Sequence, residues 1–154
     1  MVYLALGSNL SSTYGDRFYN IDLAVSYLQG YGIQLIGRSN FYETPSYPNK
    51  KNPKFINIII SVNTNLPPED LMSVIIYIEE KIERKRETKN NPRTCDIDII
   101  DYNGEVHASQ YRNEEFVVPH KELSLRNFVL FPLKEMAPKW VHPETKETID
   151  ELIN

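Results

Sequence analysis

The sequence contains a single cysteine, Cys95, among its 154 residues. One cysteine allows neither an intramolecular disulfide nor a zinc site built on thiolates, so the composition fits a reducing compartment. No stretch approaches the roughly 20 consecutive apolar residues that a membrane-spanning helix needs. No basic segment precedes the apolar residues at the N-terminus, as it would in a signal peptide. We therefore expect a cytoplasmic protein with no membrane partner.

The sequence also lacks a surplus of positive charge. Its 17 Lys and Arg residues stand against 21 Asp and Glu residues, a formal net charge of −4. This balance argues against a protein that coats nucleic acid, because such binding depends on cationic side chains. The motifs of P-loop nucleotidases, Rossmann dehydrogenases, zinc proteases and α/β-hydrolases are absent as well. These enzyme classes lose support.

The size and composition are those of one globular domain, residues 1–154, with 41% hydrophobic and 25% charged residues. Apolar residues at helical spacing predict helices, and β-branched and aromatic runs predict strands. The predicted elements are a strand at 2–8, a helix at 16–28, strands at 33–42 and 55–64, a helix at 67–82, a strand at 94–102, and helices at 128–136 and 148–153. Residues 43–54 contain three prolines and are predicted as a long loop, a kind of segment that is often functional.

The order of the first six elements is strand, helix, strand, strand, helix, strand. This βαββαβ order is typical of ferredoxin-like folds. We therefore predict an α+β protein with an antiparallel sheet, both helices on one face, and a C-terminal extension after Tyr102. The other face is then free for a ligand.

Asp96 and Asp98 stand two residues apart in the predicted strand 94–102. Side chains alternate along a strand, so both carboxylates point to one face while Ile97 and Ile99 point to the other. At a Cα separation of roughly 6.5–7 Å, two carboxylates can hold one Mg²⁺ or bridge two ions, as in two-metal phosphoryl transfer. An Asp-x-Asp pair is also common on a solvated sheet face, so it does not establish a metal site alone.

A basic cluster precedes the carboxylate pair. Between Arg84 and Arg93 there are five basic residues and one acid, Glu87, which is a local charge of +4 (five minus one). Cations beside carboxylates that bind metal are what a metal–triphosphate site requires. The alternative is a solvated helix C-terminus, where the helix dipole favours Lys and Arg.

Five further side chains are candidates for ligand contacts. His120, followed by Arg126, is suited to donating hydrogen bonds to a phosphate. Phe55 and Phe128 can form a slot for a flat ring, although most aromatic residues serve packing. Asn57 lies between apolar strand residues and needs a partner if it is buried, which the edge of a heterocycle would supply.

Several segments together resemble the 6-hydroxymethyl-7,8-dihydropterin pyrophosphokinase family of folate biosynthesis. They follow the family order and lie at residues 6–10, 41–45, 55–57, 92–99, 119–120 and 126–133. The resemblance implies transfer of a diphosphoryl group from MgATP, the co-substrate, to the hydroxymethyl oxygen of the pterin, with release of AMP. It also implies two Mg²⁺ ions. We expect a monomer.

The resemblance assigns roles to individual residues. The metal ligands are Asp96 and Asp98. The catalytic residues are Arg84, Arg93, Asp96 and Asp98; the ATP site consists of Glu79, Arg84, Arg93, Ile99, His120 and Arg126; and the pterin pocket consists of Thr44, Pro45, Phe55, Asn57 and Phe128.

The chain departs from the family pattern near the basic cluster. Ile76 and Glu83 stand where the family commonly has Gln and Gly, and the loop at 84–93 is one residue shorter and lacks a frequent Trp. Two alternative hypotheses remain open. One is a ferredoxin-like module that binds single-stranded RNA by stacking. The other is a relative that binds ATP or pterin with weak or no turnover.

Overall fold

The computed structural model describes residues 1–46, 51–85, 92–111, 114–120, 123 and 127–153. The elements in chain order are β1 (Val2–Ser8), α1 (Arg17–Gly30), β2 (Gln34–Arg38), β3 (Tyr42–Thr44), β4 (Phe55–Asn63), α2 (Pro68–Lys81), β5 (Asp96–Tyr102), β6 (His107–Tyr111), β7 (Glu114–Val118), α3 (Asn127–Met136) and α4 (Ile149–Leu152). Within these described ranges, none of the helices has both the length and the apolar character needed to cross a bilayer.

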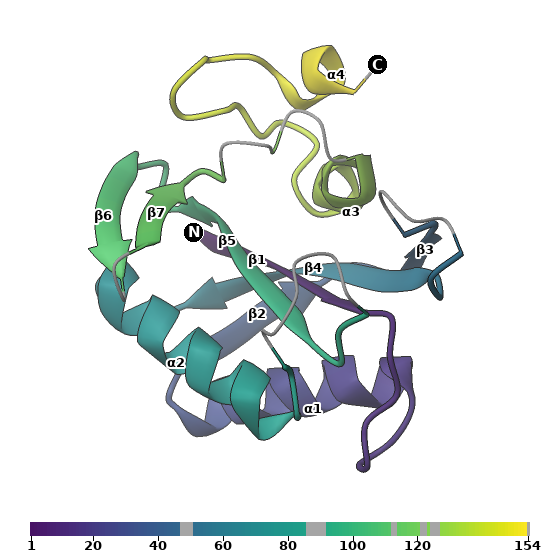
Figure 1. Cartoon of the computed structure of the whole chain (residues 1–154). Helices are drawn as coiled ribbons and strands as arrows, with labels where there is room; N and C mark the ends of the chain where they lie inside the picture. Colours follow the sequence, from purple (N-terminus) through teal and green to yellow (C-terminus); the bar gives the residue numbers. More distant parts are fainter. Residues whose placement is uncertain (47–50, 86–91, 112–113, 121–122, 124–126, 154) are drawn as a thin grey trace.

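The main sheet has the strand order β2-β4-β1-β5, with β3 also paired to β4, and all neighbouring strands are antiparallel. Helices α1 and α2 cover one face of this sheet, and α3 and α4 lie on the other side (Figure 1). The α+β ferredoxin-like prediction is therefore confirmed, including the placement of its first two helices on one face. The extension after β5 covers part of the second face.

Two predictions of strands need correction. The single strand predicted at 33–42 is two strands, β2 and β3, which both pair with β4. Between them the chain is held by Ser39, whose N–H donates to the Ile59 carbonyl at 2.8 Å while its Oγ accepts from the Ile59 N–H at 3.0 Å. These two bonds replace regular strand pairing. The β6–β7 hairpin, which pairs residues 107–111 with 114–118, was not predicted at all.

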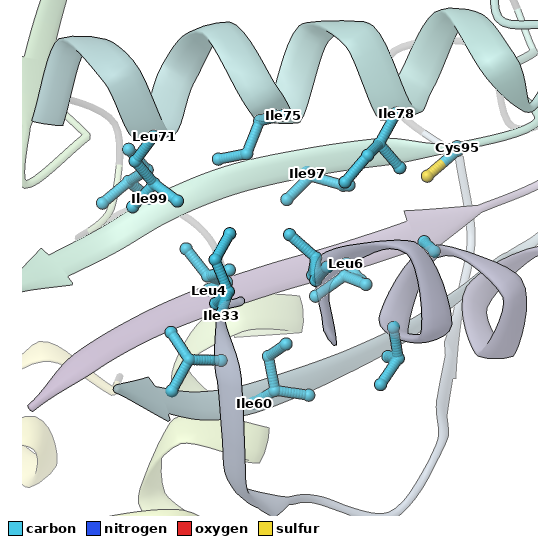
Figure 2. Close-up of a cluster of buried hydrophobic side chains, with 14 of the residues drawn as sticks. Leu4, Leu6, Ile33, Ile60, Leu71, Ile75, Ile78, Cys95, Ile97 and Ile99 are labelled. Atoms are coloured by element: carbon cyan, nitrogen blue, oxygen red, sulfur yellow. The ribbon is translucent and has the colours of Figure 1, made fainter. Parts of the chain in front are cut away.

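The first hydrophobic core lies between the sheet and the helices α1 and α2. Figure 2 shows side chains of β1, β4 and β5 meeting those of α2, among them Leu6, Ile97 and Ile78. Each fully buried aliphatic side chain of this size stabilises the fold by roughly 1.5–3 kcal/mol. Cys95 belongs to this core, and burial raises the pKa of its thiol well above the ordinary value. Cys95 therefore lies on the same face as Ile97 and Ile99, opposite the carboxylate pair.

A second core joins the C-terminal extension to the opposite face of the sheet. It includes Ile59 and Ile100 from the sheet and Trp140 from the extension. A register shift opposite Tyr3 and Leu4 places two consecutive β5 residues, Ile100 and Asp101, on this side.

A buried hydrogen bond anchors the extension. The Trp140 Nε1–H donates to Asp101 Oδ2 at 2.7 Å, and the N–H of Gly104 donates to the other oxygen of Asp101 at 2.8 Å. Both Trp140 and Asp101 are buried. The carboxylate is therefore satisfied by one group from the extension and one from the turn that follows β5.

We predict that Trp140→Phe lowers the free energy of unfolding by about 1.5–3 kcal/mol, the usual loss when a buried hydrogen bond to a charged group is removed. The ring packing is largely kept, so the loss reports the Asp101 contact. Equilibrium urea unfolding followed by circular dichroism measures it. Phe131→Leu, on an exposed side chain of α3, is the control and should cost less than about 0.5 kcal/mol. Equal losses for the two variants would contradict the prediction.

Candidate active site

Asp96 and Asp98 lie on the face of β5 that turns away from the helical core. In the register with β1, Asp96 is opposite Gly7 and Asp98 is opposite Ala5. The intervening Ile97 and the following Ile99 are buried in the first core. Both carboxylates are partly exposed, as the alternation of the strand predicts.

Two arginines from separate segments bind Asp96. Arg84 Nη1 donates to Asp96 Oδ1 at 3.0 Å, and Arg93 Nη1 donates to Asp96 Oδ2 at 3.2 Å. Arg84 follows α2, whereas Arg93 precedes β5. Each oxygen of the carboxylate thus carries one charge-assisted hydrogen bond, and each retains a lone pair for another ligand.

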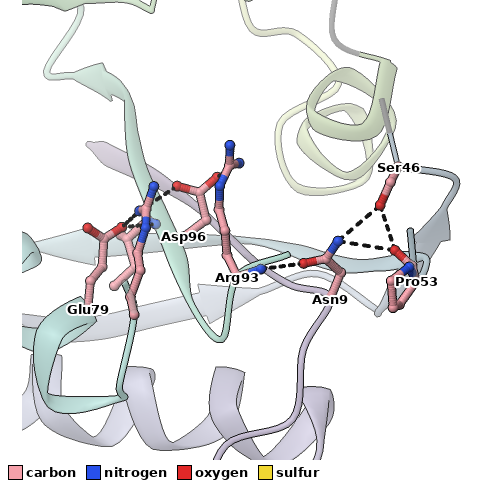
Figure 3. Close-up of polar contacts among 8 residues, drawn as sticks. Asn9, Ser46, Pro53, Glu79, Arg93 and Asp96 are labelled. Atoms are coloured by element: carbon pink, nitrogen blue, oxygen red, sulfur yellow. Dashed lines mark hydrogen bonds and ion pairs between the residues drawn. The ribbon is translucent and has the colours of Figure 1, made fainter. Parts of the chain in front are cut away.

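Glu79 of α2 binds both Arg84 and the main chain of β5. Its Oε2 accepts from Arg84 Nη1 at 2.6 Å and from the main-chain N–H of Ile97 at 2.7 Å (Figure 3). The side chain of Glu79 is only 1% exposed. Its carboxylate therefore holds Arg84 and the edge of β5 in place.

The charges around Arg84 determine its protonation. Burial by itself would lower the pKa of its guanidinium, but the carboxylates of Asp96, Glu79 and Asp98 outweigh burial and raise the pKa above its ordinary value. Arg84 therefore remains a cation at any physiological pH. The alternation of β5 places Asp98 on the same face as Asp96.

The structure of the C-terminus of α2 positions Arg84 beside this site. The Arg84 N–H donates to the Glu79 carbonyl and the Glu83 N–H donates to the Glu80 carbonyl, both at 3.0 Å, which is the Schellman pattern of a helix end. This motif needs a left-handed residue, usually Gly, at the position of Glu83, whose φ is +67°. Glu83 adopts this backbone without being glycine, and its carboxylate accepts hydrogen bonds from the N–H and the hydroxyl of Thr13.

The predicted pterin residues gather beside the same row of the sheet. Asn57 of β4 is opposite Gly7 of β1, which in turn is opposite Asp96. Asn57 Nδ2 donates to Thr44 Oγ1 at 3.2 Å. A Cβ added to Gly7 would lie 2.6 Å from Asn57 Oδ1, so only glycine leaves room for this carboxamide. Two strand spacings of roughly 4.8 Å separate Asp96 from Asn57, about the length of a bicyclic ring with a short substituent.

The aromatic candidates lie at the edges of this row. Phe55 pairs in register with Thr44 and is half-buried, while Phe128, in the first turn of α3, is 36% exposed. Glu135 links α3 to β3, because it accepts a hydrogen bond from Tyr42 Oη at 2.6 Å. This hydrogen bond raises the pKa of Tyr42. Pro45 directly follows β3, next to Thr44.

Three predicted nucleotide-binding residues remain: Ile99, His120 and Arg126. The side chain of Ile99 is buried in the first core, so only its main chain can contact a ligand. Ile97 turns its N–H to the outer edge of β5, toward Glu79, and residues two apart share an edge, so Ile99 presents its main-chain groups there too. His120 is half-buried after β7, and Arg126 lies outside the described residues.

The donor set suits magnesium. Among the residues that the structure describes there is no group of three or more His, Cys, Asp or Glu side chains arranged to hold a metal ion. Mg²⁺ is usually bound through one or two carboxylates, with water and substrate phosphates as its other ligands. Asp96 and Asp98 fit this pattern, whereas they would make a poor zinc or calcium site.

A cavity of about 790 Å³ lies next to the loop after β1, among residues that flank Arg84 and Arg93 in the chain. It is lined by Leu10, Ser11, Thr13, Glu83, Lys85, Pro92 and Thr94. None of the predicted site residues belongs to this lining. The active-site assignment therefore depends on the sheet face with Asp96 and Asn57 and not on this cavity.

Sequence reasoning missed three residues that shape the site: Gly7, Asn9 and Glu135. Gly7 and Asn9 belong to a segment that resembles the family, but no role was assigned to them. A polar residue such as Asn9 directly after a buried strand is a usable signal, because buried amides require partners.

A ferredoxin-like sheet with two carboxylates on one face, flanked by two arginines that bind one of them, is an arrangement typical of metal-dependent phosphoryl transfer. A model of the family described as 7,8-dihydro-6-hydroxymethylpterin-pyrophosphokinase (HPPK) matches residues 3–138. The chain therefore belongs to this family.

Relatives with that activity in their names support the assignment. The chain is 37% identical over 140 residues to a 2-amino-4-hydroxy-6-hydroxymethyldihydropteridine pyrophosphokinase of Methylorubrum extorquens, covering 90% of this chain and 84% of the relative. It is 33% identical over 150 residues to the enzyme of that name from Aquifex aeolicus, covering 97% of this chain and 88% of the relative.

Longer proteins match as well. The wild-type HPPK-DHPS structure of Plasmodium falciparum superimposes with a TM-score of 0.77 at 18% identity, covering 98% of this chain and 43% of that chain. A likeness at this identity concerns the fold alone. The chain also spans 22% of the folic acid synthesis protein FOL1 of Dictyostelium discoideum, at 35% identity over 152 residues and 99% of this chain.

The contact between Thr13 and Glu83 predicts how stability depends on pH. Hydrogen bonds from the Thr13 hydroxyl and N–H lower the pKa of Glu83 below its ordinary value of 4.5. A lowered folded-state pKa stabilises the fold above about pH 4.5, and the gain is lost as the pH falls through the lowered pKa. Thr13→Val should therefore have a lower Tm than the wild type at neutral pH, and this difference should shrink in acid.

Thermal unfolding by circular dichroism between about pH 7 and pH 3 tests this, a range chosen to bracket the carboxyl titration. Thr64→Val is the matched control, because the Thr64 hydroxyl accepts from the Leu66 N–H and involves no carboxylate. Its Tm difference from the wild type should be independent of pH. A Thr13→Val difference that stays constant down to the acid limit would refute the linkage.

Proposed function

We propose that this chain transfers a diphosphoryl group from MgATP to the hydroxymethyl oxygen of 6-hydroxymethyl-7,8-dihydropterin, releasing AMP. The observation that carries the proposal is the row Asp96–Gly7–Asn57 across three strands. It joins a carboxylate bound by two arginines to a carboxamide suited to a heterocycle edge. Family membership supports the same reaction.

Asp96 and Asp98 are the proposed ligands of two Mg²⁺ ions, which when bound would neutralise phosphate charge and lower the pKa of the attacking alcohol. The described cluster supports a need for divalent cations. Arg84 and Arg93 contribute +2, and Glu79, Asp96 and Asp98 contribute −3, a sum of −1. A negative cluster of this kind repels a triphosphate unless metal ions are added.

Arg84 and Arg93 are the proposed phosphate ligands. Each uses its Nη1 on Asp96, and a guanidinium has five N–H donors, so donors remain on both side chains. Among the described residues, Arg84 Nε is buried and has no hydrogen-bond partner in the protein. His120 and Arg126 complete the proposed triphosphate site.

The pterin pocket is proposed to consist of Thr44, Pro45, Phe55, Asn57 and Phe128. The Asn57 carboxamide and main-chain groups near Thr44 supply donors and acceptors for the edge of the ring, and the two Phe rings supply apolar surface for its faces. The ring edge at Asn57 then orients the hydroxymethyl substituent toward Asp96 and Asp98. Holding the alcohol close to the metal ions matters more here than a strong base.

The nucleotide base is proposed to contact the outer edge of β5. The main chain of Ile99 faces that edge beside Ile97, whose N–H is already bound by Glu79. Adenine can hydrogen-bond a strand edge without side-chain help, which explains how Ile99 contributes although its side chain is buried. Glu79 acts through Arg84 and through β5.

The structure disfavours an RNA-binding module. Single-stranded RNA on a ferredoxin-like sheet stacks on exposed aromatic residues of the open face. Here Ile59 and Ile100 on that face are buried under the C-terminal extension, in the second core. A relative with weak turnover has no described observation in its favour: Glu83 keeps the left-handed backbone at φ +67°, and its carboxylate is bound by Thr13.

The domain extent, the oligomeric state and the cellular location complete the proposal. Residues 1–154 act as one catalytic domain, since both cores are built on the same sheet. The proposed active form is a monomer. It acts in the cytoplasm, where its co-substrate ATP is available.

We predict that the purified chain with MgATP and 6-hydroxymethyl-7,8-dihydropterin forms AMP and pterin diphosphate in equal amounts, as measured by chromatography of the nucleotides. Asp96→Asn and Asp98→Asn should each lower kcat by roughly 10²–10³-fold or more, since each removes a charge that stabilises the transition state. Removing Mg²⁺ with EDTA should abolish the reaction.

Asp22→Asn is the matched control. Asp22 is a surface carboxylate paired with Arg38 at 3.0 Å on the helical side, so its variant should keep wild-type turnover. Formation of ADP instead of AMP would refute diphosphoryl transfer. Full activity of either active-site variant would refute the metal-ligand assignment.

A further inference from the structure

Asn9 follows β1 and is almost fully buried, with 2% of its surface exposed. Its Nδ2 donates to Ser46 Oγ at 3.0 Å and to the Pro53 carbonyl at 3.1 Å. Its Oδ1 accepts from the Arg93 N–H at 2.6 Å, and its own N–H donates to the Arg93 carbonyl at 3.0 Å. Figure 3 shows the side chain between Ser46 and Pro53 on one side and Arg93 on the other.

The two partners of Nδ2 adjoin the proposed pterin pocket. Ser46 follows Pro45 directly, and Pro53 lies two residues before Phe55. Ser46 Oγ also donates to the Pro53 carbonyl at 2.5 Å, so both residues form one unit with Asn9. The partner of Oδ1 is the residue whose side chain binds Asp96.

We propose that Asn9 is a positioning residue that couples the pterin pocket to the phosphate-binding arginine Arg93. A primary carboxamide is the one planar side-chain group that offers two N–H donors and an acceptor within a single short side chain. Here the donors hold the pterin side and the acceptor holds the arginine side. The coupling role in catalysis rests on the proposed function, but the physical link between the two segments does not.

Substituting aspartate for Asn9 would separate the effect of its acceptor from the effect of its two donors. Asn9→Asp keeps an acceptor for the Arg93 N–H but loses both donors to Ser46 and Pro53. Asn9→Ala loses all three side-chain bonds and leaves buried polar groups without partners. A coupling residue therefore predicts two different patterns, whereas a residue that only adds stability predicts uniform loosening.

The matched control is Asn20→Ala. Asn20 is also a buried carboxamide: it donates to the Leu10 carbonyl at 3.0 Å and accepts from Ser12 Oγ at 2.6 Å. These side-chain bonds reach neither Ser46, nor Pro53, nor Arg93. It thus reports the general effect of losing a buried amide in the same part of the fold.

Amide hydrogen exchange of the intact chain, read by mass spectrometry, tests the proposal. Asn9→Ala should speed exchange by roughly tenfold or more, since local opening becomes easier, both in peptides that contain Ser46 or Pro53 and in the peptide that contains Arg93. Asn9→Asp should speed it in the first group and leave the Arg93 peptide near the wild type. Asn20→Ala should change neither group.

Kinetics supply the second measurement. Asn9→Ala should raise the KM for the pterin and lower kcat, because it disturbs both the pocket and Arg93, and Asn9→Asp should mainly raise that KM. Faster exchange in only one group for Asn9→Ala, or the same pattern in Asn20→Ala, would overturn the coupling. A wild type that forms no AMP would refute the proposed function, while the exchange patterns would still decide whether Asn9 links the two segments.

Discussion

The ion cluster of Glu79, Arg84 and Asp96 is the interaction on which the rest of the site depends. Glu79 is a carboxylate removed from water, and such a charge is tolerated only with a close cationic partner and further hydrogen bonds. Arg84 and the Ile97 N–H supply both, at 2.6 and 2.7 Å. One buried carboxylate thereby fixes the end of α2, the edge of β5 and the orientation of Asp96, which Arg93 then completes from the other side.

Much of the fold could be predicted from local patterns. The alternation around Ile97 and Ile99 correctly separated the core face from the carboxylate face. The break at Ser39 could not be predicted, because it depends on two bonds to Ile59, a residue twenty positions away. The β6–β7 hairpin escaped prediction because Ala108, Ser109 and Gln110 have little strand preference, and only pairing with β7 makes them a strand.

In the site, too, some features follow from local sequence and others depend on residues far apart in the chain. Arg84, Arg93 and Asp96 lie within 13 consecutive residues, and their spacing together with the family resemblance indicated a joint role. The packing of Asn57 against Gly7 and the contacts of Asn9 depend on register and loop positions far apart in the sequence. Glu83 shows the limit of comparing sequences residue by residue. Its departure from the family glycine raises doubt, yet the left-handed backbone is retained and Thr13 binds the new carboxylate.

The register shift between β1 and β5 constrains how this chain can change during evolution. Before the shift β5 turns Asp96 and Asp98 to the site, and beyond it Asp101 faces the same side to bind Trp140. Both orientations depend on one extra residue within the strand. A deletion there would reverse the faces of one half of β5 relative to the other. A change in the length of this strand would therefore separate the chemistry at one end from the anchor of the C-terminal extension at the other.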